Sequence, residues 1–567
     1  MSNYSPETTR TLAIVGHGAA GKTTLIEALL AKAGAIAAPG SVQRGNTVCD
    51  YDPLEKEHLH SVKLALAHLE HAGMRVHLLD TPGYPDFMGQ ALCALDAVET
   101  VAVVIDAQKG IELTASRMMH WAQTRKLDRM IVVNKIDAPG VDLPGLLGEI
   151  QGAFGRECLP INLPAGAGTK VTDCFFNPGG EADFSSVAEA HRALVDQVVE
   201  VDEDLMNLYL EQGEVQPDQL HAPFEQALRE GHLVPVCFVS AQTGAGVAEL
   251  LDVLAKLLPN PSEGNPALFV KGEDAAAVPF RAEPDPARHV IAHVFKVEMD
   301  PYVGKICAFR IHQGTVTPNS QLYIGESRKP FKVGHLYMLQ GKQLTEVEVG
   351  VPGDICAVTK IDDLGFDAVL HDAPEDDHIH MLPLDFPHAV YGLAVRPKKQ
   401  ADASKLAEVL HKLTAEDPGL AVEHDATTHE AVIRGLGEMH LATGDLPQAN
   451  HLAESVVASG RQLASAYRLR GDIRRRREEF EEALADYHRA LAIEPVYPEV
   501  QMAVAAVYYR QDRPQRVLST LQAMAGSYPS GEEPAEMLYW QGLAYKALGR
   551  REQAVAHLAK AEERGLR

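Results

Sequence analysis

The chain has 567 residues, which at roughly 100–200 residues per domain predicts three to five domains. Its formal net charge of −26 excludes binding of free DNA driven by bulk charge, because phosphate contacts need clustered Lys and Arg, although a ribosome-docking protein can use local patches. We expect no membrane span because no apolar run is long enough, and seven cysteines without CxxC spacing predict reduced thiols in a cytoplasm.

The first predicted domain covers 1–262 and alternates apolar runs with helical patterns. The runs are too continuously apolar for half-exposed strands, so they predict an α/β fold with a parallel sheet covered on both faces. A stretch rich in Pro, Ala, Glu and Asp follows, and we interpret 263–286 as a linker. The expected strands lie at 11–15, 75–80, 100–106, 129–134 and 234–240.

The next two predicted domains are built from shorter strands. Runs punctuated by Gly and Pro at 289–297, 306–313 and 321–324 predict a small β-barrel over 287–372. A further stretch rich in Pro and Asp follows. The pattern after it is strand, helix, strand, strand, and it predicts a truncated α+β, ferredoxin-like domain over 383–441. Those elements are expected at 389–396, 401–414, 420–424 and 430–434.

From residue 444 onward, strand signals end and a 34-residue period begins. Small residues at shared positions allow two antiparallel helices to approach, and aromatic residues fill the gap between pairs. The pattern resembles the tetratricopeptide repeat and predicts an all-α solenoid over 444–567, with a half copy at 444–459; a plain helical bundle is the alternative. One repeat position holds Gly471, Ala505 and Gly542, a second holds Ala483, Val517 and Ala554, and a third holds Pro495 and Pro529.

A GxxxxGK[ST] motif follows the first expected strand and opens a helix. Glycines let backbone N–H groups close around phosphates at a helix N-terminus, where the dipole favours anions. Lys22 is expected to reach the β- and γ-phosphates, and Thr23 to bind magnesium. The candidate phosphate-binding residues are Gly16, His17, Gly18, Ala19, Ala20, Gly21, Lys22, Thr23 and Thr24.

Three further motifs lie at or near the ends of apolar strands. In the DxxG motif, Asp80 is expected to hold magnesium and the Gly83 amide to sense the γ-phosphate. In the NKxD motif, a carboxylate accepts from guanine N1 and N2, which argues for GTP over ATP. A weaker motif would place a backbone amide at guanine O6. The candidate guanine-site residues are Asn134, Lys135, Asp137, Ser240 and Ala241.

Together these motifs resemble the GTPase domain of translational factors. The segments 300–305 and 351–354 look like the second domain of elongation factor G, and 416–418 and 433–441 look like its third. The resemblance covers about residues 8–441 and is closest to the divergent elongation factor G-like group. It implies GTP and Mg²⁺ as cofactors, GTPase activity, and ribosome binding through the factor-like domains.

The sequence departs from that family at three site positions. Tyr84 follows the DxxG glycine, where the family places a histidine that orients water. Ala19 replaces a loop aspartate, and Ser61 aligns with the magnesium-binding threonine. Phosphoryl transfer depends on positioning and charge stabilisation, so we expect slow hydrolysis with Lys22, Gly83 and Tyr84 as the catalytic candidates. The magnesium candidates are Thr23, Ser61 and Asp80.

A larger departure begins near Ala442, where the third-domain pattern stops. No later segment resembles the fourth and fifth domains that drive translocation in the family, so ordinary translocase activity is not expected. Both neighbouring units look cut at one point, which fits a natural gene fusion or a constructed chimera. We hypothesise that an apolar helix face over 446–457 packs on the third-domain sheet.

Several other clusters have a functional and a plain interpretation. For each we favour the plain one. We interpret His58 and His60 as solvated switch-loop residues rather than metal ligands, and His371, His378 and His380 as part of a solvated linker rather than a metal site. We interpret Arg474–Arg477 as a helix face offset by nearby Glu rather than a peptide or RNA contact, and Cys49 as an ordinary loop thiol.

Three functions remain open from the sequence. The leading one is a slow GTPase switch with truncated elongation-factor architecture, whose repeats bind an unknown peptide or protein. The second is a repeat scaffold with a regulatory or inert nucleotide domain, since solenoids offer concave binding surfaces. The third is a fusion whose parts fold separately and have no joint function.

Overall fold

The structure is a computed structural model. The chain divides into two compact units: Met1–Val395 with Glu408–Leu441, and Arg396–Ala407 with Ala442–Arg567. The described residues are 4–212, 215, 219–265, 267–272, 277–300, 302–389, 391–395, 403–425, 430–437, 440–441, 464–476, 479–493, 497–525 and 534–563.

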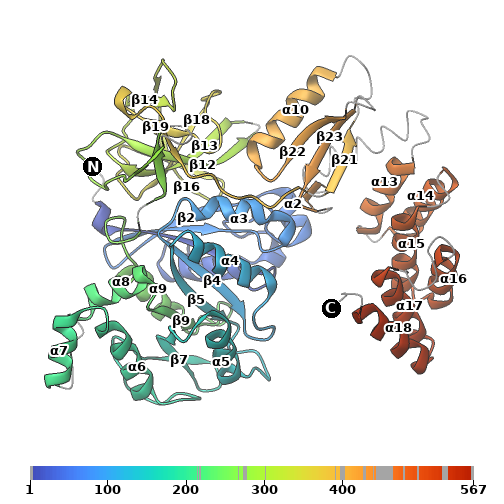
Figure 1. The fold of residues 1–567 in the computed structure, drawn as a ribbon, viewed down its shortest axis with the longest axis horizontal. Coiled ribbons are helices and arrows are strands. Elements are labelled where there is room, and N and C mark those ends of the chain that lie inside the picture. The colour runs from blue at the N-terminus through green and yellow to red at the C-terminus, as the bar shows by residue number, and fades with distance from the viewer. Residues whose placement is uncertain are drawn as a thin grey trace. The chain divides into compact units, whose positions relative to one another are not determined.

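A seven-stranded sheet in the order β2-β3-β1-β4-β5-β9-β6 forms the first domain (Figure 1). All neighbouring strands are parallel except β2 and β3, so the predicted parallel sheet has an antiparallel edge. The reason is a two-residue turn at Ala72 and Gly73, both with positive φ, which closes a hairpin. The strands are β1 (Thr9–Gly16), β2 (Ala65–His71), β3 (Met74–Asp80), β4 (Thr100–Asp106), β5 (Asp128–Asn134), β6 (Cys158–Pro160) and β9 (Val234–Phe238).

Helices cover both faces of this sheet, as the continuously apolar strands predicted. Alternate residues of β1 face opposite cores: Leu12 and Ile14 on one side, Ala13 and Val15 on the other. The first core takes α1 (Lys22–Lys32), α6 (Val187–Val199), α8 (His221–Glu230) and α9 (Val247–Lys256); the second takes α3 (Met88–Leu95), α4 (Leu113–Thr124) and α5 (Leu143–Phe154). The remaining elements are α2 (Pro53–His58), α7 (Glu203–Gln212) and the hairpin of β7 (Asn162–Ala165) and β8 (Lys170–Asp173).

The predicted β-barrel is observed as an eight-stranded antiparallel sheet in the order β15-β14-β19-β12-β13-β18-β16-β17. Its interior is a separate core that includes Phe309, Leu336 and Leu370. The strands are β12 (Ile291–Asp300), β13 (Gly304–Gln313), β14 (Gln321–Ile324), β15 (Phe331–Lys332), β16 (Leu336–Gln340), β17 (Gln343–Val347), β18 (Ile355–Thr359) and β19 (Val369–His371).

The segment interpreted as a linker, 263–286, needs correction because it carries two strands. β10 (Phe269–Lys271) and β11 (Val278–Phe280) pair with each other, and β10 also pairs with β20 (Ile379–Met381). Phe269 and Met381 bury a small apolar cluster there. Strands this short carry too few alternating residues to stand out among Pro and Asp.

The third domain follows the predicted order of elements. Its strands pair antiparallel in the order β21-β23-β22 beside one helix. The elements are β21 (Tyr391–Val395), α10 (Ala403–Glu416), β22 (Ala421–Asp425) and β23 (Glu430–Gly435). The half repeat at 444–459 and the packing helix at 446–457 lie outside the described residues.

The described part of the repeat region consists of consecutive helix pairs with their own core. Gly471 permits close packing as expected, since a Cβ there would lie 2.7 Å from the Tyr487 ring. The helices are α13 (Ala464–Arg476), α14 (Phe480–Ile493), α15 (Pro498–Arg510), α16 (Pro514–Ala525), α17 (Ala535–Ala547) and α18 (Arg551–Glu563).

The basic run on α13 differs from the predicted solvated face. Arg474 donates to Asp486 of α14 at 2.8 Å instead of relying on a nearby Glu, and Arg470 binds the same carboxylate through two hydrogen bonds of 2.6 and 2.7 Å. Asp486 is fully buried, so it needs these cations. The side chains of Arg476 and Arg477 lie outside the described part.

No helix within the described residues is long and apolar enough to cross a membrane. All seven cysteines are free and buried, including Cys49 of the predicted switch loop.

A buried arginine joins the second domain to the first. Arg310 of β13 donates to the Thr11 hydroxyl at 2.5 Å and to the Ala97 carbonyl at 2.6 Å, and it pairs with the Glu99 carboxylate. Apolar residues of both domains share one core around this contact. The two domains are therefore packed as one unit.

We predict that Arg310→Ala destabilises this unit by about 3–5 kcal/mol, because it leaves the Glu99 carboxylate buried without its cation. Urea unfolding of the full chain would measure the change. Arg328→Ala, at an exposed position of the same domain, is the matched control and should stay within about 0.5 kcal/mol. Equal effects of the two substitutions would contradict the role of the buried pair.

Candidate functional site

The predicted phosphate-binding loop lies between the end of β1 and the start of α1. Gly16 has a φ of 138°, and a Cβ there would lie 2.4 Å from the Val104 carbonyl oxygen, so the turn needs glycine. Lys22, the first residue of α1, donates from Nζ to the carbonyls of Gly16 at 3.0 Å and His17 at 2.9 Å. Burial lowers the pKa of Lys22 to about 8. A cation and a helix N-terminus thus meet at a loop suited to an anion.

A chain of hydrogen bonds connects three segments beside this loop. The Thr23 hydroxyl donates to Asp80 at 2.7 Å and lies 3.2 Å from the Ser61 hydroxyl, which donates to Asp50 at 2.7 Å. The predicted magnesium candidates are therefore together, and the sequence missed Asp50 as a fourth member. No signal marked Asp50, because it lies outside any strand end or motif.

Both carboxylates in this chain are buried, and each has one oxygen without a hydrogen-bond partner, Asp50 Oδ2 and Asp80 Oδ1. Burial raises the pKa of Asp80 to about 7 and also raises the pKa of Asp50. Hydroxyl and carboxylate oxygens are the ligands that hard divalent cations prefer. The donor set therefore fits a Mg²⁺ ion, which would satisfy the unpaired oxygens.

Asn134, the last residue of β5, holds the opposite side of the site together. Its amide nitrogen donates to the Ala20 carbonyl at 2.9 Å, and its amide oxygen accepts from the Ala241 backbone at 3.0 Å. Lys135 reaches across to the Ala19 carbonyl at 2.8 Å and to Asp106 at 2.6 Å. The loop after β9 is thereby fixed beside the phosphate-binding loop.

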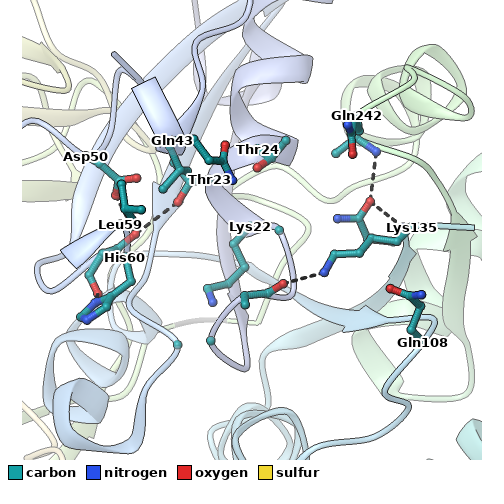
Figure 2. A pocket seen from close by; sticks show the side chains of 18 of the residues that line it. Lys22, Thr23, Thr24, Gln43, Asp50, Leu59, His60, Gln108, Lys135 and Gln242 are labelled. Atoms are coloured by element: carbon teal, nitrogen blue, oxygen red, sulfur yellow. Dashed lines mark hydrogen bonds between the residues drawn. The ribbon is translucent and has the colours of Figure 1, made fainter. Parts of the chain in front are cut away.

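These segments enclose a cavity of about 600 Å³, within the usual range for a small-molecule site. Figure 2 shows Asp50 and His60 on one side, Lys135 and Gln242 on the other, and Lys22 between them. Some predicted site residues are not part of the cavity lining: Gly16, His17, Ala20, Asp80 and Ser240. The predicted residues that line it are Gly18, Ala19, Gly21, Lys22, Thr23, Thr24, Ser61, Gly83, Tyr84, Asn134, Lys135, Asp137 and Ala241.

The cavity also has lining residues that the sequence did not single out for binding. His60 was expected to be solvated, but it is half-buried, lines the cavity, and has its ring centroid 4.7 Å from that of Tyr84. Burial lowers the pKa of His60. The others include Val42, Gln43, Asp50, Leu59, Gln108 and Gln242.

The histidines considered as a second metal site are not in one loop. His371 is fully buried in β19, where its ring nitrogens lie 2.7 Å from the carbonyls of Ala373 and Gly325, which corrects the solvated-loop interpretation for this residue. His378 and His380 are exposed. In the part of the chain that the structure describes, no three His, Cys, Asp or Glu residues are grouped as metal ligands.

The loop that carries Ser61 contacts both other domains of its unit. Lys63 lies 3.1 Å from Asp52 and 3.6 Å from Glu416, at the end of α10. Glu416 also accepts from the Met299 backbone of β12 at 2.9 Å. Nearby carboxylates raise the pKa of Lys63 despite its burial. One carboxylate therefore connects the loop, the second domain and the third domain.

Family models match most of the chain. A model described as Elongation factor Tu GTP binding domain matches 7–260, Elongation factor G domain 2 matches 289–370, and Elongation Factor G, domain III matches 386–443. A TPR repeat model matches 471–512. These are the same families that the sequence motifs resembled.

Similar proteins include an elongation factor G-like protein of Mycobacterium tuberculosis, 32% identical over 77% of this chain, and one of Thermotoga maritima, 30% identical over 76%. Each match spans 64% of the relative. A crystal structure of a protein from Thermus thermophilus has a TM-score of 0.67 and 33% identity over 80% of this chain and 66% of its own. The chain therefore carries elongation factor G-like GTPase domains joined to a tetratricopeptide repeat.

Proposed function

We propose that the chain binds GTP with Mg²⁺ in the cavity and hydrolyses it slowly as a molecular switch. The observation that carries the proposal is one cavity lined by Lys22, Thr23, Gly83 and Asp137, which come from the separate motifs. Motif residues with separate chemical tasks would have no reason to converge there without a shared ligand. The GTPase family matches support the same conclusion.

The proposed roles follow from chemistry at each position. Backbone amides of 16–24 would surround the phosphates, with Lys22 on the β- and γ-phosphates and the Gly83 amide on the γ-phosphate. Thr23, Ser61 and Asp80 would hold Mg²⁺, with Asp50 beside them. When bound, the ion would neutralise charge on the phosphate oxygens. Asp137 would accept from guanine, and Asn134, Lys135, Ser240 and Ala241 would position the base loops.

We expect slow hydrolysis because Tyr84 stands where an ionisable imidazole is expected in the family. A tyrosine hydroxyl can contact water but supplies no cation to stabilise charge in the transition state. The ribosome is the proposed partner of the factor-like domains, which would place the chain in the cytoplasm. The repeats are proposed to bind a peptide or protein.

We predict that Lys22→Ala abolishes GTP binding, because a buried ammonium is the main cation available to the phosphates. Titration with a fluorescent guanine nucleotide would show a loss of more than about 100-fold in affinity, typical for removal of a charged hydrogen-bond donor. Lys32→Ala, at the exposed end of the same helix, is the matched control. Tight binding by Lys22→Ala would show that the site is wrongly assigned.

We predict that Asp137→Asn shifts base preference from guanine to xanthine. The carboxylate accepts two hydrogen bonds from guanine, whereas an amide can donate to the xanthine carbonyl. Competition of GTP, XTP and ATP for the cavity measures the order of affinities. An unchanged preference for GTP would count against the guanine assignment.

We predict single-turnover hydrolysis by the full chain on the order of 10⁻³ s⁻¹, as for GTPases that lack a stabilising cation. Addition of ribosomes should raise the rate if the factor-like domains bind them. Fast GTP hydrolysis by the chain without any partner would contradict the proposal that hydrolysis is slow. Nucleotide binding with no turnover, with or without ribosomes, would favour the repeat-scaffold function instead.

A further inference from the structure

One side chain in the cavity has a place that the proposed function does not use. His60 lies where the lining also includes Lys22, Gly83 and Tyr84. The next residue, Ser61, is held by its contacts with Thr23 and Asp50, so the backbone at His60 is fixed close to the proposed Mg²⁺ ligands. The imidazole therefore belongs to the proposed γ-phosphate end of the site.

Aromatic neighbours surround the ring of His60, with His58 and Phe87 on other sides at centroid distances of 5.7 and 6.0 Å. The Tyr84 ring lies against it, with centroids 4.7 Å apart and planes tilted by 58°. Tyr84 itself is backed by Gly18, where a Cβ would lie 2.8 Å from the tyrosine ring. Tyr84 therefore lies between His60 and the phosphate-binding loop, and a larger residue at position 18 would clash with the tyrosine ring.

The hydrogen-bonding state of the ring follows from its neighbour. His60 Nδ1 lies 3.3 Å from the Ser61 carbonyl, which can only accept, so the neutral tautomer assigned from this contact carries its proton on Nδ1. Nε2 is then a hydrogen-bond acceptor. Among the nearby acceptors, Asp50 Oδ1 accepts from Ser61 and the Gln43 side-chain oxygen accepts from Ser41, whereas the unpaired oxygens of Asp50 and Asp80 are those assigned to the proposed Mg²⁺ ion.

We propose that His60 Nε2 accepts a hydrogen bond from the water that attacks the γ-phosphate and holds that water in place, with Tyr84 packing the ring. This inference rests on the proposed GTPase function. In the reaction, the water oxygen bonds to the γ-phosphorus, and the bond to the β–γ bridging oxygen breaks. Its electron pair leaves on GDP. One water proton stays on the oxygen that is now bonded to phosphorus, and the other passes to a second oxygen of the phosphate, which leaves as H2PO4⁻. His60 orients the water and keeps no proton.

His60 then gives this site a water-orienting imidazole from the loop of Ser61 instead of from the residue after Gly83. Because Ser61 is also a proposed Mg²⁺ ligand, the water and the ion depend on the same loop conformation. Hydrolysis would therefore require that loop to be closed, whereas GDP binding would not.

The test compares His60→Ala and His60→Gln in the full chain with Glu57→Ala as the matched control. Glu57 is exposed, lies near the end of α2 just before this loop, and does not line the cavity. Three quantities are measured: affinity for fluorescent GDP, single-turnover GTP hydrolysis, and capture of GDP with aluminium fluoride, a mimic of the transferring phosphate.

We expect His60→Ala to keep GDP affinity within about threefold, to lose about 100-fold in hydrolysis, and to lose aluminium fluoride capture. His60→Gln, which retains an acceptor, should recover part of both, and Glu57→Ala should match the wild type. Preserved GDP affinity also shows that each variant is folded. If His60→Ala loses GDP affinity, His60→Leu, which also lacks an acceptor, is measured in its place, with the same expected losses.

Several results would overturn the inference. One is hydrolysis within threefold of wild type by His60→Ala. Another is loss of hydrolysis in Tyr84→Phe with no loss in His60→Ala, which would show that the tyrosine hydroxyl is the acceptor. A His60→Gln rate equal to that of His60→Ala would also count against a hydrogen-bond role. If the wild-type chain bound no GTP, that result would instead contradict the proposed GTPase function.

Discussion

The hydrogen bond from the Thr23 hydroxyl to the Asp80 carboxylate, 2.7 Å long, is the contact on which the site depends. It joins the start of α1 to the end of β3 and, through Ser61 and Asp50, draws a third segment to the same point. Two buried carboxylates sharing such a chain are costly unless a cation offsets their charge, because burial removes the water that would otherwise do so. The observed positions of the loops therefore require a positive charge close to the two carboxylates.

This constraint extends beyond the first domain. The segment that carries Ser61 continues to Lys63, whose ammonium lies between Asp52 and Glu416. Tyr51 of the same segment donates to Glu298 at 2.8 Å, which also holds Lys296 of β12. A change at Ser61 would thus disturb ion pairs that hold the second and third domains. Under the proposed function, this shared set of buried charges would couple the loop of Ser61 to both domains.

The sequence predicted best where one local pattern determines structure. Continuous apolar runs identified β1, β3 and β5, and the motifs at their ends indicated the cavity, since side chains at one edge of a parallel sheet converge. It failed where the outcome depends on distant partners. The small sheet of β10 and β11 is completed by β20, which pairs with β10 from more than a hundred residues later in the chain. Asp50 joins the site only through Ser61, which in turn contacts Thr23.

The repeat region differs from the first unit in how it is held together. Its helices bury their own apolar core, and the α13–α14 pair is additionally joined through Asp486 and two arginines. Within the described residues each unit has an apolar core of its own, and the covalent connection keeps the two units together in any arrangement. A tether of this kind can raise the local concentration of a bound ligand to the millimolar range. If the first unit docks on the ribosome as proposed, the repeats would hold their peptide or protein near it, and that gain needs no contact between the units.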